Sequence, residues 1–155
     1  MAHPAPLPLR RAVAEDAPAV RALSRAAYAK WVPLIGREPK PMTADYGKAV
    51  REHVVFLHEG PEGLLGVLEL IPAMDHLLVE NVAVSPAAQG RGLGRALMAH
   101  AETVAGALGL AEMRLYTNEK FTDNIRLYEL LGYTVYDRTP VSTSVAVWMR
   151  KRLQK

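Results

Sequence analysis

One stretch of the sequence, residues 77–100, constrains the fold more than any other, and it reads LLVENVAVSPAAQGRGLGRALMAH. The stretch begins with an apolar run rich in β-branched residues, and this run ends at Ser85 and Pro86. A glycine-rich segment follows, and then apolar residues with helical spacing. This order predicts a strand, a loop and a helix. Because the first turn of a helix has unpaired backbone N–H groups and the positive end of the helix dipole, the loop is predicted to bind an anion, most naturally a phosphate.

The glycines of the loop favour a pyrophosphate ligand. Gly90, Gly92 and Gly94 have no side chain to hold a ligand away from the backbone amides, and Arg91 and Arg95 add positive charge. No Lys-Ser or Lys-Thr follows these glycines, which excludes a P-loop. A dinucleotide-binding fingerprint that starts at Gly90 would need a glycine where Arg95 stands, so it is excluded as well.

Residues 89–94 match the pattern Q-x-x-G-x-G, and here the chain resembles the GCN5-related N-acetyltransferases. The resemblance extends through ENVAVSP, LYTN and NIRLYELLGY, so that it is close over residues 64–137 and loose elsewhere. It implies that the loop binds the pyrophosphate of acetyl-CoA, the co-substrate. The implied cofactor-binding residues are Val82, Ala83, Val84, Gln89, Gly90, Arg91, Gly92, Leu93, Gly94, Arg95 and Asn124. The alternative is a glycine-rich loop with a structural role only.

Length and composition predict one domain over residues 1–155. The absence of cysteine excludes disulfides, thiolate metal sites and a cysteine nucleophile, and the five histidines show no metal-ligand spacing, so no metal is expected. The net charge of +3 is modest and argues against nucleic acid as a partner. Four basic residues near the end, Arg150, Lys151, Arg152 and Lys155, are interpreted as a solvated tail. With no signal peptide and no run long enough to span a membrane, a soluble cytoplasmic protein is expected.

The remaining pattern predicts a mixed α/β domain. Strands are expected over residues 7–13, 53–58, 64–71, 77–84, 112–117, 133–137 and 141–149. Helices are expected from Glu15 to Trp31, over 44–51 with Thr43 as cap, over 90–108 and over 122–131, and segment 32–42 is expected to be irregular. Periodicity alone gives an α/β or α+β domain. The order β-α-α-β-β-β-α-β-α-β-β resembles the family fold, a mixed, mostly antiparallel twisted sheet of about seven strands with helices on both faces.

Acetyl transfer to an amine needs an oxyanion site, a base and an acid. The resemblance implies that the strand around Val82 and Val84 splays from its neighbour, which frees backbone N–H groups to bind the thioester carbonyl and the pantetheine. Glu80 is the predicted base, since it lies in an apolar run and strand alternation would place it on the same face as Val82 and Val84. Alternatively, Glu80 pairs with an Arg or caps loop amides.

Tyr128 is the predicted acid, because it matches the family tyrosine that protonates the departing thiolate. Its alternative role is packing in the core. The family pattern also has a CoA-binding Asn seven residues earlier, where this chain has Phe121. Asn124 lies one helical turn from Tyr128 and is the substitute candidate for binding pantetheine. Asn118 is expected to orient the substrate or to cap the next helix.

The acceptor site is expected in the first helices and their connection. Aromatic and acidic residues there suit a cationic amine with an apolar body, although they would equally serve to pack the loop on the sheet. The candidates are Tyr28, Trp31, Met42, Asp45 and Tyr46, with Asn118 added for substrate and Asp75 and His76 at the rim.

The sequence therefore predicts an acetyl-CoA-dependent N-acetyltransferase that acts on a primary amine by direct transfer in a ternary complex. The expected partners are a small-molecule amine or a peptide, and homodimerisation through the C-terminal strand is left open. The alternatives are a non-catalytic acetyl-CoA-binding regulatory module and an acetyltransferase that acts on a protein or on charged tRNA.

Overall fold

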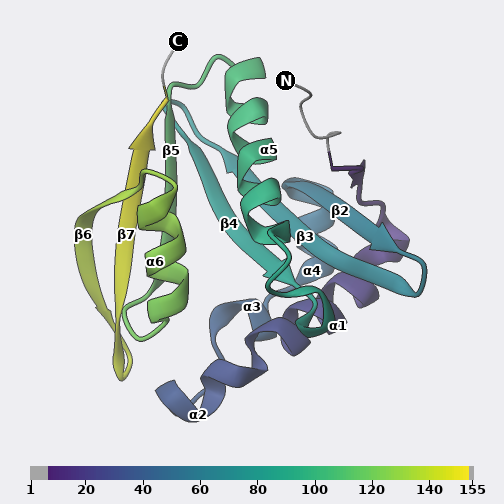
Figure 1. Ribbon diagram of the computed structural model, residues 1–155, viewed down its shortest axis with the longest axis horizontal. Helices are drawn as coiled ribbons and strands as arrows, with labels where there is room; N and C mark the ends of the chain where they lie inside the picture. Colours follow the sequence, from purple (N-terminus) through teal and green to yellow (C-terminus); the bar gives the residue numbers. More distant parts are fainter. Residues whose placement is uncertain (1–6, 154–155) are drawn as a thin grey trace.

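The computed structural model describes residues 7–153, and its centre is one seven-stranded sheet in the order β1-β2-β3-β4-β5-β7-β6 (Figure 1). Neighbouring strands are antiparallel except β4 and β5, which are parallel. The strands are β1 (Arg10–Arg11), β2 (Val54–Gly60), β3 (Gly63–Pro72), β4 (Leu77–Val84), β5 (Glu112–Asn118), β6 (Thr134–Val141) and β7 (Ser144–Arg152). The mixed, mostly antiparallel sheet of seven strands confirms the predicted fold class.

Helices cover both faces of the sheet. The α-helices are α1 (Ala17–Tyr28), α2 (Val32–Ile35), α3 (Lys40–Thr43), α4 (Tyr46–Glu52), α5 (Leu93–Ala107) and α6 (Thr122–Leu130), and the 3-10 turns are η1 (Ala14–Asp16), η2 (Ala29–Trp31) and η3 (Pro86–Ala88). One core joins α5 and Tyr128 of α6 to β3, β4, β5 and β7. A second core joins α1 and α4 to β2, β3 and β4 on the opposite face. Figure 1 shows α5 and α6 in front of the sheet.

The parallel contact between β4 and β5 is short, and this shapes the site. Only Leu77, Leu78 and Val79 of β4 pair with β5, although β4 continues to Val84. Beyond Val79 the two strands diverge, as Figure 1 shows between the labels β4 and β5. The far half of β4 therefore has one edge without a partner strand, which is the splay that the sequence resemblance implies.

A β-bulge at Glu80 changes the face to which β4 side chains point. Glu69 of β3 pairs with Asn81 and the next residue, Leu70, pairs with Val79, so Glu80 has no partner in the register. Such an extra residue interrupts the two-residue alternation of a strand. Val82 packs against the core beneath α5, whereas Glu80 contacts α3 across the other face. The predicted common face of Glu80, Val82 and Val84 is therefore wrong.

Several predicted boundaries also differ. The first strand is only two residues long, and segment 32–42 is not irregular throughout, because prolines at the first turns begin the single-turn helices α2 and α3. Helix α4 is capped by Asp45, whose side chain accepts a hydrogen bond from the Lys48 N–H at 3.0 Å, and not by Thr43. Helix α5 begins at Leu93 and not at Gly90.

The C-terminal end of the described chain differs from the interpretation as a tail. Residues 150–152 belong to β7, where the Lys151 Nζ lies 2.9 Å from a Glu102 carboxylate oxygen, while Lys155 lies outside the described residues. Strand β7 is interior, between β5 and β6, so the sheet edge at this end is β6 and not the C-terminal strand. Among residues 7–153, no helix has the length and apolar character that crossing a membrane requires.

Candidate active site

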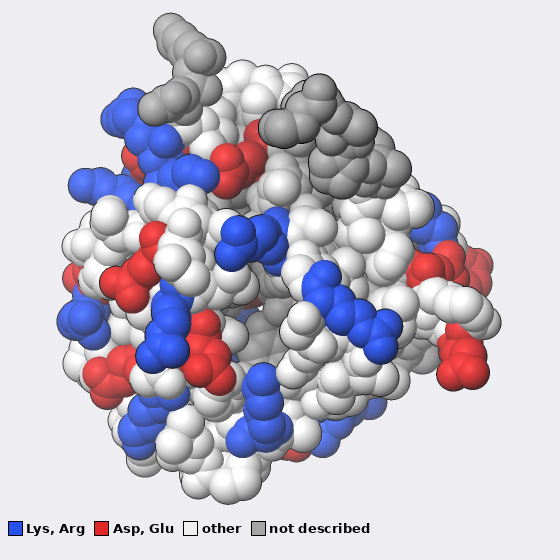
Figure 2. Space-filling view, in the orientation of Figure 1, with Lys and Arg blue, Asp and Glu red and all other residues white. Residues whose placement is uncertain are grey.

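Two cavities meet where β4 leaves β5. The first, of about 420 Å³, lies between the diverging strands and is closed by the α2–α3 segment, the start of α6 and β7. The second, of about 390 Å³, lies between the glycine loop, η2 and α6. Four residues line both cavities, namely Tyr28, Val82, Asn124 and Tyr128. Figure 2 shows Lys and Arg side chains on several sides of a hollow near the middle of this face.

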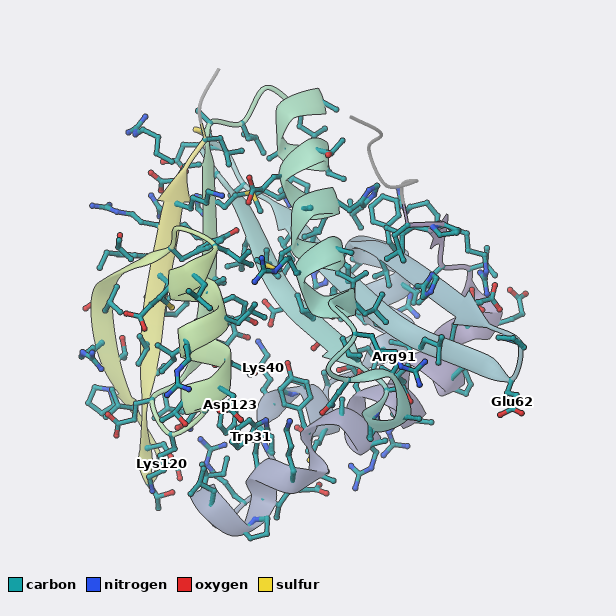
Figure 3. The ribbon with its side chains drawn as sticks, viewed as in Figure 1. Trp31, Lys40, Glu62, Arg91, Lys120 and Asp123 are labelled. Carbon is teal, nitrogen blue, oxygen red and sulfur yellow. The ribbon has the colours of Figure 1, made fainter. Side chains whose placement is uncertain are left out.

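The second cavity contains the glycine loop and is the candidate phosphate site. Gly90 and Gly92 have φ of 82° and 80°, a left-handed conformation that side chains with a Cβ rarely adopt. Gly92 is the N-cap of α5 and supplies no side chain, so the first amides of the helix are left for a ligand. Lys30 and Arg95 line the cavity and supply positive charge. Arg91 lies on the loop but is not among the lining residues (Figure 3).

Gln89 holds the loop against the end of β4. Its Nε2 donates to the Val84 carbonyl oxygen at 3.1 Å, and its Oε1 accepts from the Lys30 Nζ at 3.3 Å. Gln89 therefore both fixes the position of the loop and lines the cavity. Leu93, 9% exposed, anchors the first turn of α5 in the core.

The hydrogen-bond pattern of β4 determines which amides are free. The Ser85 N–H donates to the Leu65 carbonyl at 2.8 Å, and in an antiparallel pair such bonded positions alternate along the strand. Val82 and Val84 are therefore the positions whose N–H and C=O point away from β3, towards the open edge. Ala83 points the other way: its main chain faces β3 and its side chain, 1% exposed, is buried in the core with α1. The structure does not bring Ala83 to the predicted cofactor site.

Glu80 lies in the first cavity with partners other than those predicted. Its Oε1 is 2.8 Å from the Lys40 Nζ and accepts a hydrogen bond of 2.5 Å from the Tyr116 hydroxyl. Burial, and then the bond to Glu80, raises the pKa of Tyr116 to about 12. Burial lowers the pKa of Lys40, but its bonds to Glu80 and Tyr116 outweigh burial and raise it. Lys40 is therefore a charged ammonium that already occupies the place of a cation beside Glu80 (Figure 3).

Tyr128 and Asn124 come together on α6, as their spacing predicts. Tyr128 is 9% exposed, and burial raises its pKa to about 12, so the phenol is protonated at neutral pH. The hydrogen bonds among residues 7–153 include none to its hydroxyl, and the residue lines both cavities. Tyr128 is thus placed both to pack in the core and to donate into the site.

Phe121, which stands where the family pattern has Asn, makes an aromatic contact instead. Its ring stacks on Trp31 with 4.6 Å between centroids, and it lies 6.4 Å from the Tyr28 ring. This contact joins η2 to the start of α6 across the mouth of the site. The Asn118 Oδ1 accepts from the Lys120 N–H at 2.9 Å, so Asn118 caps the turn before α6 while lining the first cavity.

The predicted acceptor residues divide into two groups. Tyr28 lines both cavities, and its hydroxyl lies 3.2 Å from both the Asn81 Oδ1 and the Val82 carbonyl oxygen. Trp31 lines only the second cavity. Tyr46 lines neither: it is 4% exposed and donates to the Pro41 carbonyl, which fixes the α3 segment.

Four other candidates also lie outside the cavities. Met42 is buried in the core at 5% exposure, and Asp45 caps α4. The Asp75 carboxylate and the His76 Nδ1 pair with each other at 2.7 Å in the β3–β4 turn. These residues stabilise local structure and do not line the cavities.

Sequence reasoning missed many of the residues that line the first cavity. Among them are Arg37, Lys40, Tyr116, Val141 and Trp148. Tyr116 lies within the quoted LYTN motif, and Trp148 pairs with it in the β5–β7 register, so strand alternation could have identified both. Within the described range, no group of three or more His, Cys, Asp or Glu side chains is placed to hold a metal ion.

Comparisons with known proteins agree with this geometry. The chain is 50% identical over 56 residues, 36% of its length, to a mycothiol acetyltransferase from Streptosporangium roseum, but the match covers only 17% of that protein. A solved GCN5-related N-acetyltransferase from Rhodopseudomonas palustris superposes with a TM-score of 0.81 at 19% identity, covering 96% of this chain and 97% of that one.

A second solved structure is the PaiA N-acetyltransferase from Thermoplasma acidophilum in complex with coenzyme A. It superposes with a TM-score of 0.75 at 17% identity, covering 94% of this chain and 98% of that one. At these identities the two structures bear on the fold. The model of the acetyltransferase (GNAT) family matches residues 19–133, which include the glycine loop, α6 and most of the residues that line the first cavity. The chain therefore belongs to the acetyltransferase (GNAT) family.

Proposed function

We propose that residues 1–155 form one acetyl-CoA-dependent N-acetyltransferase domain that acetylates a primary amine by direct transfer in a ternary complex. The observation that carries the proposal is the junction of the two cavities. There the open edge of β4 at Val82 lies between the glycine loop on one side and Glu80 on the other. Family membership supports the acyltransferase activity, and a relative of the same fold is known in complex with coenzyme A.

The second cavity fits the phosphate end of acetyl-CoA. Its positive-φ glycines leave the backbone uncovered, and Lys30 and Arg95 provide the charge that a pyrophosphate needs. The β4 edge continues from this cavity into the first one, and it offers the N–H groups of Val82 and Val84 to an extended ligand with amide groups. Asn124, which lines both cavities, is proposed as a further partner of the pantetheine arm.

Acetyl-CoA, when bound, supplies the acetyl thioester and leaves as the CoA thiol. The Val82 N–H at the open β4 edge is proposed to stabilise negative charge that develops on the acyl oxygen, which is effective because a strand amide needs no reorganisation. Glu80 accepts the proton of the attacking amine, and Tyr128 donates a proton to the departing sulfur. The amine nitrogen gains the acetyl group as the C–S bond breaks, and no residue is acylated.

The bulge at Glu80 turns its carboxylate towards α3, which supports an acceptor site on that side of the sheet with Glu80 as its base. Glu80 points towards α3, whereas Val82 packs beneath α5 beside the loop. The two substrates would then approach from opposite faces and meet in the gap between β4 and β5. The Lys40 side chain is 64% exposed, so an incoming ammonium can replace it beside Glu80 at little packing cost.

The test is calorimetric titration with acetyl-CoA, followed by a free-thiol assay against amines, amino acids and peptides. Acetyl-CoA binding with thiol release for one acceptor class supports the proposal. Binding without thiol release for any acceptor, unchanged in Glu80→Gln, supports the non-catalytic regulatory alternative instead. Lack of acetyl-CoA binding refutes the proposal.

A further inference from the structure

Arg37 stands at the first cavity with an uncompensated positive charge. It follows α2 in the segment that closes the cavity, and it is one of the lining residues. Its Nε is buried without a hydrogen-bond partner, and the salt bridges formed within residues 7–153 do not include it. The other lining cation, Lys40, is already neutralised by Glu80.

A buried N–H without a partner is unfavourable because it has lost its bond to water, so a ligand that supplies an acceptor there gains affinity. A guanidinium has a planar set of donors that matches a carboxylate or a phosphate through two parallel hydrogen bonds. Arg37 does not line the glycine-loop cavity, where the phosphate charge of acetyl-CoA is assigned. The anion that Arg37 binds therefore belongs to the acceptor.

The charge of the cavity favours a carboxylate over a phosphate. Its ionisable lining consists of Arg37, Lys40 and Glu80, with tyrosines whose pKa is raised, so one positive charge is left uncompensated. A carboxylate balances one charge. The acceptor amine, as it replaces Lys40, meets the Glu80 carboxylate.

The remaining walls are mostly apolar. Tyr116 and Trp148 lie with ring centroids 4.9 Å apart, and Leu78, Val141 and Ala146 add apolar surface, although a few polar side chains such as Asn118 also line the cavity. The cavity volume of about 420 Å³ suits a small molecule with an apolar body. The Thr143 hydroxyl donates to the Ile35 carbonyl at 3.2 Å, which ties the β6–β7 turn to α2.

We propose that the acceptor is an amine that carries a carboxylate and an apolar body, with its nitrogen at Glu80 and its carboxylate on Arg37. The inference rests on the proposed acetyltransferase function and names the substrate class of that site. The reaction is the one given above: the N–C bond forms, the C–S bond breaks, the amine proton goes to Glu80 and Tyr128 protonates the sulfur. Arg37 takes part only by binding the carboxylate.

The experiment compares matched acids and amides: phenylalanine with phenylalaninamide, and leucine with leucinamide. Each is titrated in the presence of CoA, and each is then assayed for thiol release with acetyl-CoA. The proteins are the wild type, Arg37→Gln, Arg37→Lys and the control Arg21→Gln, whose arginine is exposed on α1 away from both cavities. Because each variant is compared on an acid and on its amide, the intrinsic reactivity of the amines cancels.

We expect the acid of at least one pair to bind more tightly than its amide in the wild type. Arg37→Gln should weaken binding of that acid by about tenfold to a hundredfold, the range for a lost charged hydrogen bond, and change the amide by less than about threefold. Arg37→Lys should be intermediate, and Arg21→Gln should leave both unchanged. Equal effects of Arg37→Gln on acid and amide, or wild-type preference for the amides in every pair, would overturn the inference.

Failure of the proposed function has a different signature. It would appear as a lack of acetyl-CoA binding, or as no thiol release for any acceptor, whichever of the amino acids binds. Thermal unfolding of each variant with and without CoA verifies that the protein is folded and that its cofactor site is intact.

Discussion

Replacing Tyr128 by Phe removes one hydroxyl from a residue that lines both cavities. General acid catalysis contributes about 10²–10⁴ in rate, which corresponds to about 2.7–5.5 kcal/mol of barrier. We therefore expect kcat to fall by a factor in this range. Acetyl-CoA affinity should change little, because the ring keeps its place in the core.

The stability of this variant is as informative as its rate. Within the described range, the Tyr128 hydroxyl forms no hydrogen bond, and the ring remains packed, so the free energy of unfolding should change by no more than about 0.5 kcal/mol. If Tyr128 were purely structural, the variant would keep both its stability and its kcat. Chemical denaturation and single-turnover kinetics on the same sample separate the two roles.

Tyr133 provides a matched control. Its ring lies 6.1 Å from the Tyr128 ring, it is 2% exposed, and its hydroxyl is buried without a partner. Burial also raises the pKa of Tyr133, but the residue lines neither cavity. Tyr133→Phe should keep kcat and gain about 1 kcal/mol, or about 2–4 °C in Tm. Unchanged turnover in Tyr128→Phe, or an equal loss of turnover in Tyr133→Phe, would refute Tyr128 as the acid.

Three further changes test other parts of the structure. Tyr116→Phe removes the hydroxyl that donates a hydrogen bond to the Glu80 carboxylate, so kcat/KM should fall by about tenfold or more in steady-state kinetics. Gly92→Val forces a branched side chain to φ 80° and should weaken acetyl-CoA binding at least about tenfold in calorimetry. The hydrogen bond from Arg10 lowers the pKa of Asp16 to about 2, so Asp16→Asn should cost about 1 kcal/mol at pH 7 after allowance for exposure. This stabilisation is present above the ordinary pKa of about 3.8 and is lost as pH falls through about 2, as acid titration of both proteins would measure.

For each of these three substitutions, one result would contradict the prediction. A kcat/KM of Tyr116→Phe that stays at the wild-type value, as that of Tyr136→Phe should, would show that the hydrogen bond to Glu80 has no part in the reaction. The control for Gly92→Val is Gly106→Val. Gly106 lies in α5, and a Cβ at this position would meet open space, so the variant should bind acetyl-CoA normally. Normal binding by Gly92→Val as well would remove the loop from the phosphate site. A stability difference for Asp16→Asn that stays undiminished as the pH falls below about 2 would show that the ion pair is not its source.

The glycine loop and its flanking elements were predictable because their signals are local. Positive φ at Gly90 and Gly92, a strand before them and a helix after them all follow from adjacent residues. The same holds for Asn124 and Tyr128, one turn apart on α6. Adjacent residues could not decide whether Thr43 or Asp45 caps α4, because both residue types are good N-caps. The position of the α3 segment decides between them.

The register of β4 could not be read from β4 alone. A bulge is a property of two strands, since it needs Glu69 and Leu70 of β3 to pair with residues two positions apart. Simple alternation therefore assigns Glu80 to the wrong face. Lys40 and Arg37 were missed for a related reason. They reach the site from a proline-rich segment about forty residues before Glu80, and no periodic pattern in that segment predicts a contact with β4.

The bulge also explains how one strand can serve two substrates. Without the extra residue, Glu80 would share a face with Val82 and would point under α5, into the core of Leu97 and Met98. An ionised carboxylate there would be costly and could not meet an amine. With the bulge, the strand presents its carboxylate to the α3 side and still offers the main chain of Val82 at the open edge. Only Asn81 separates the two positions along β4, so the proposed base and the proposed oxyanion donor are held close together by the covalent geometry of one strand and not by loop packing.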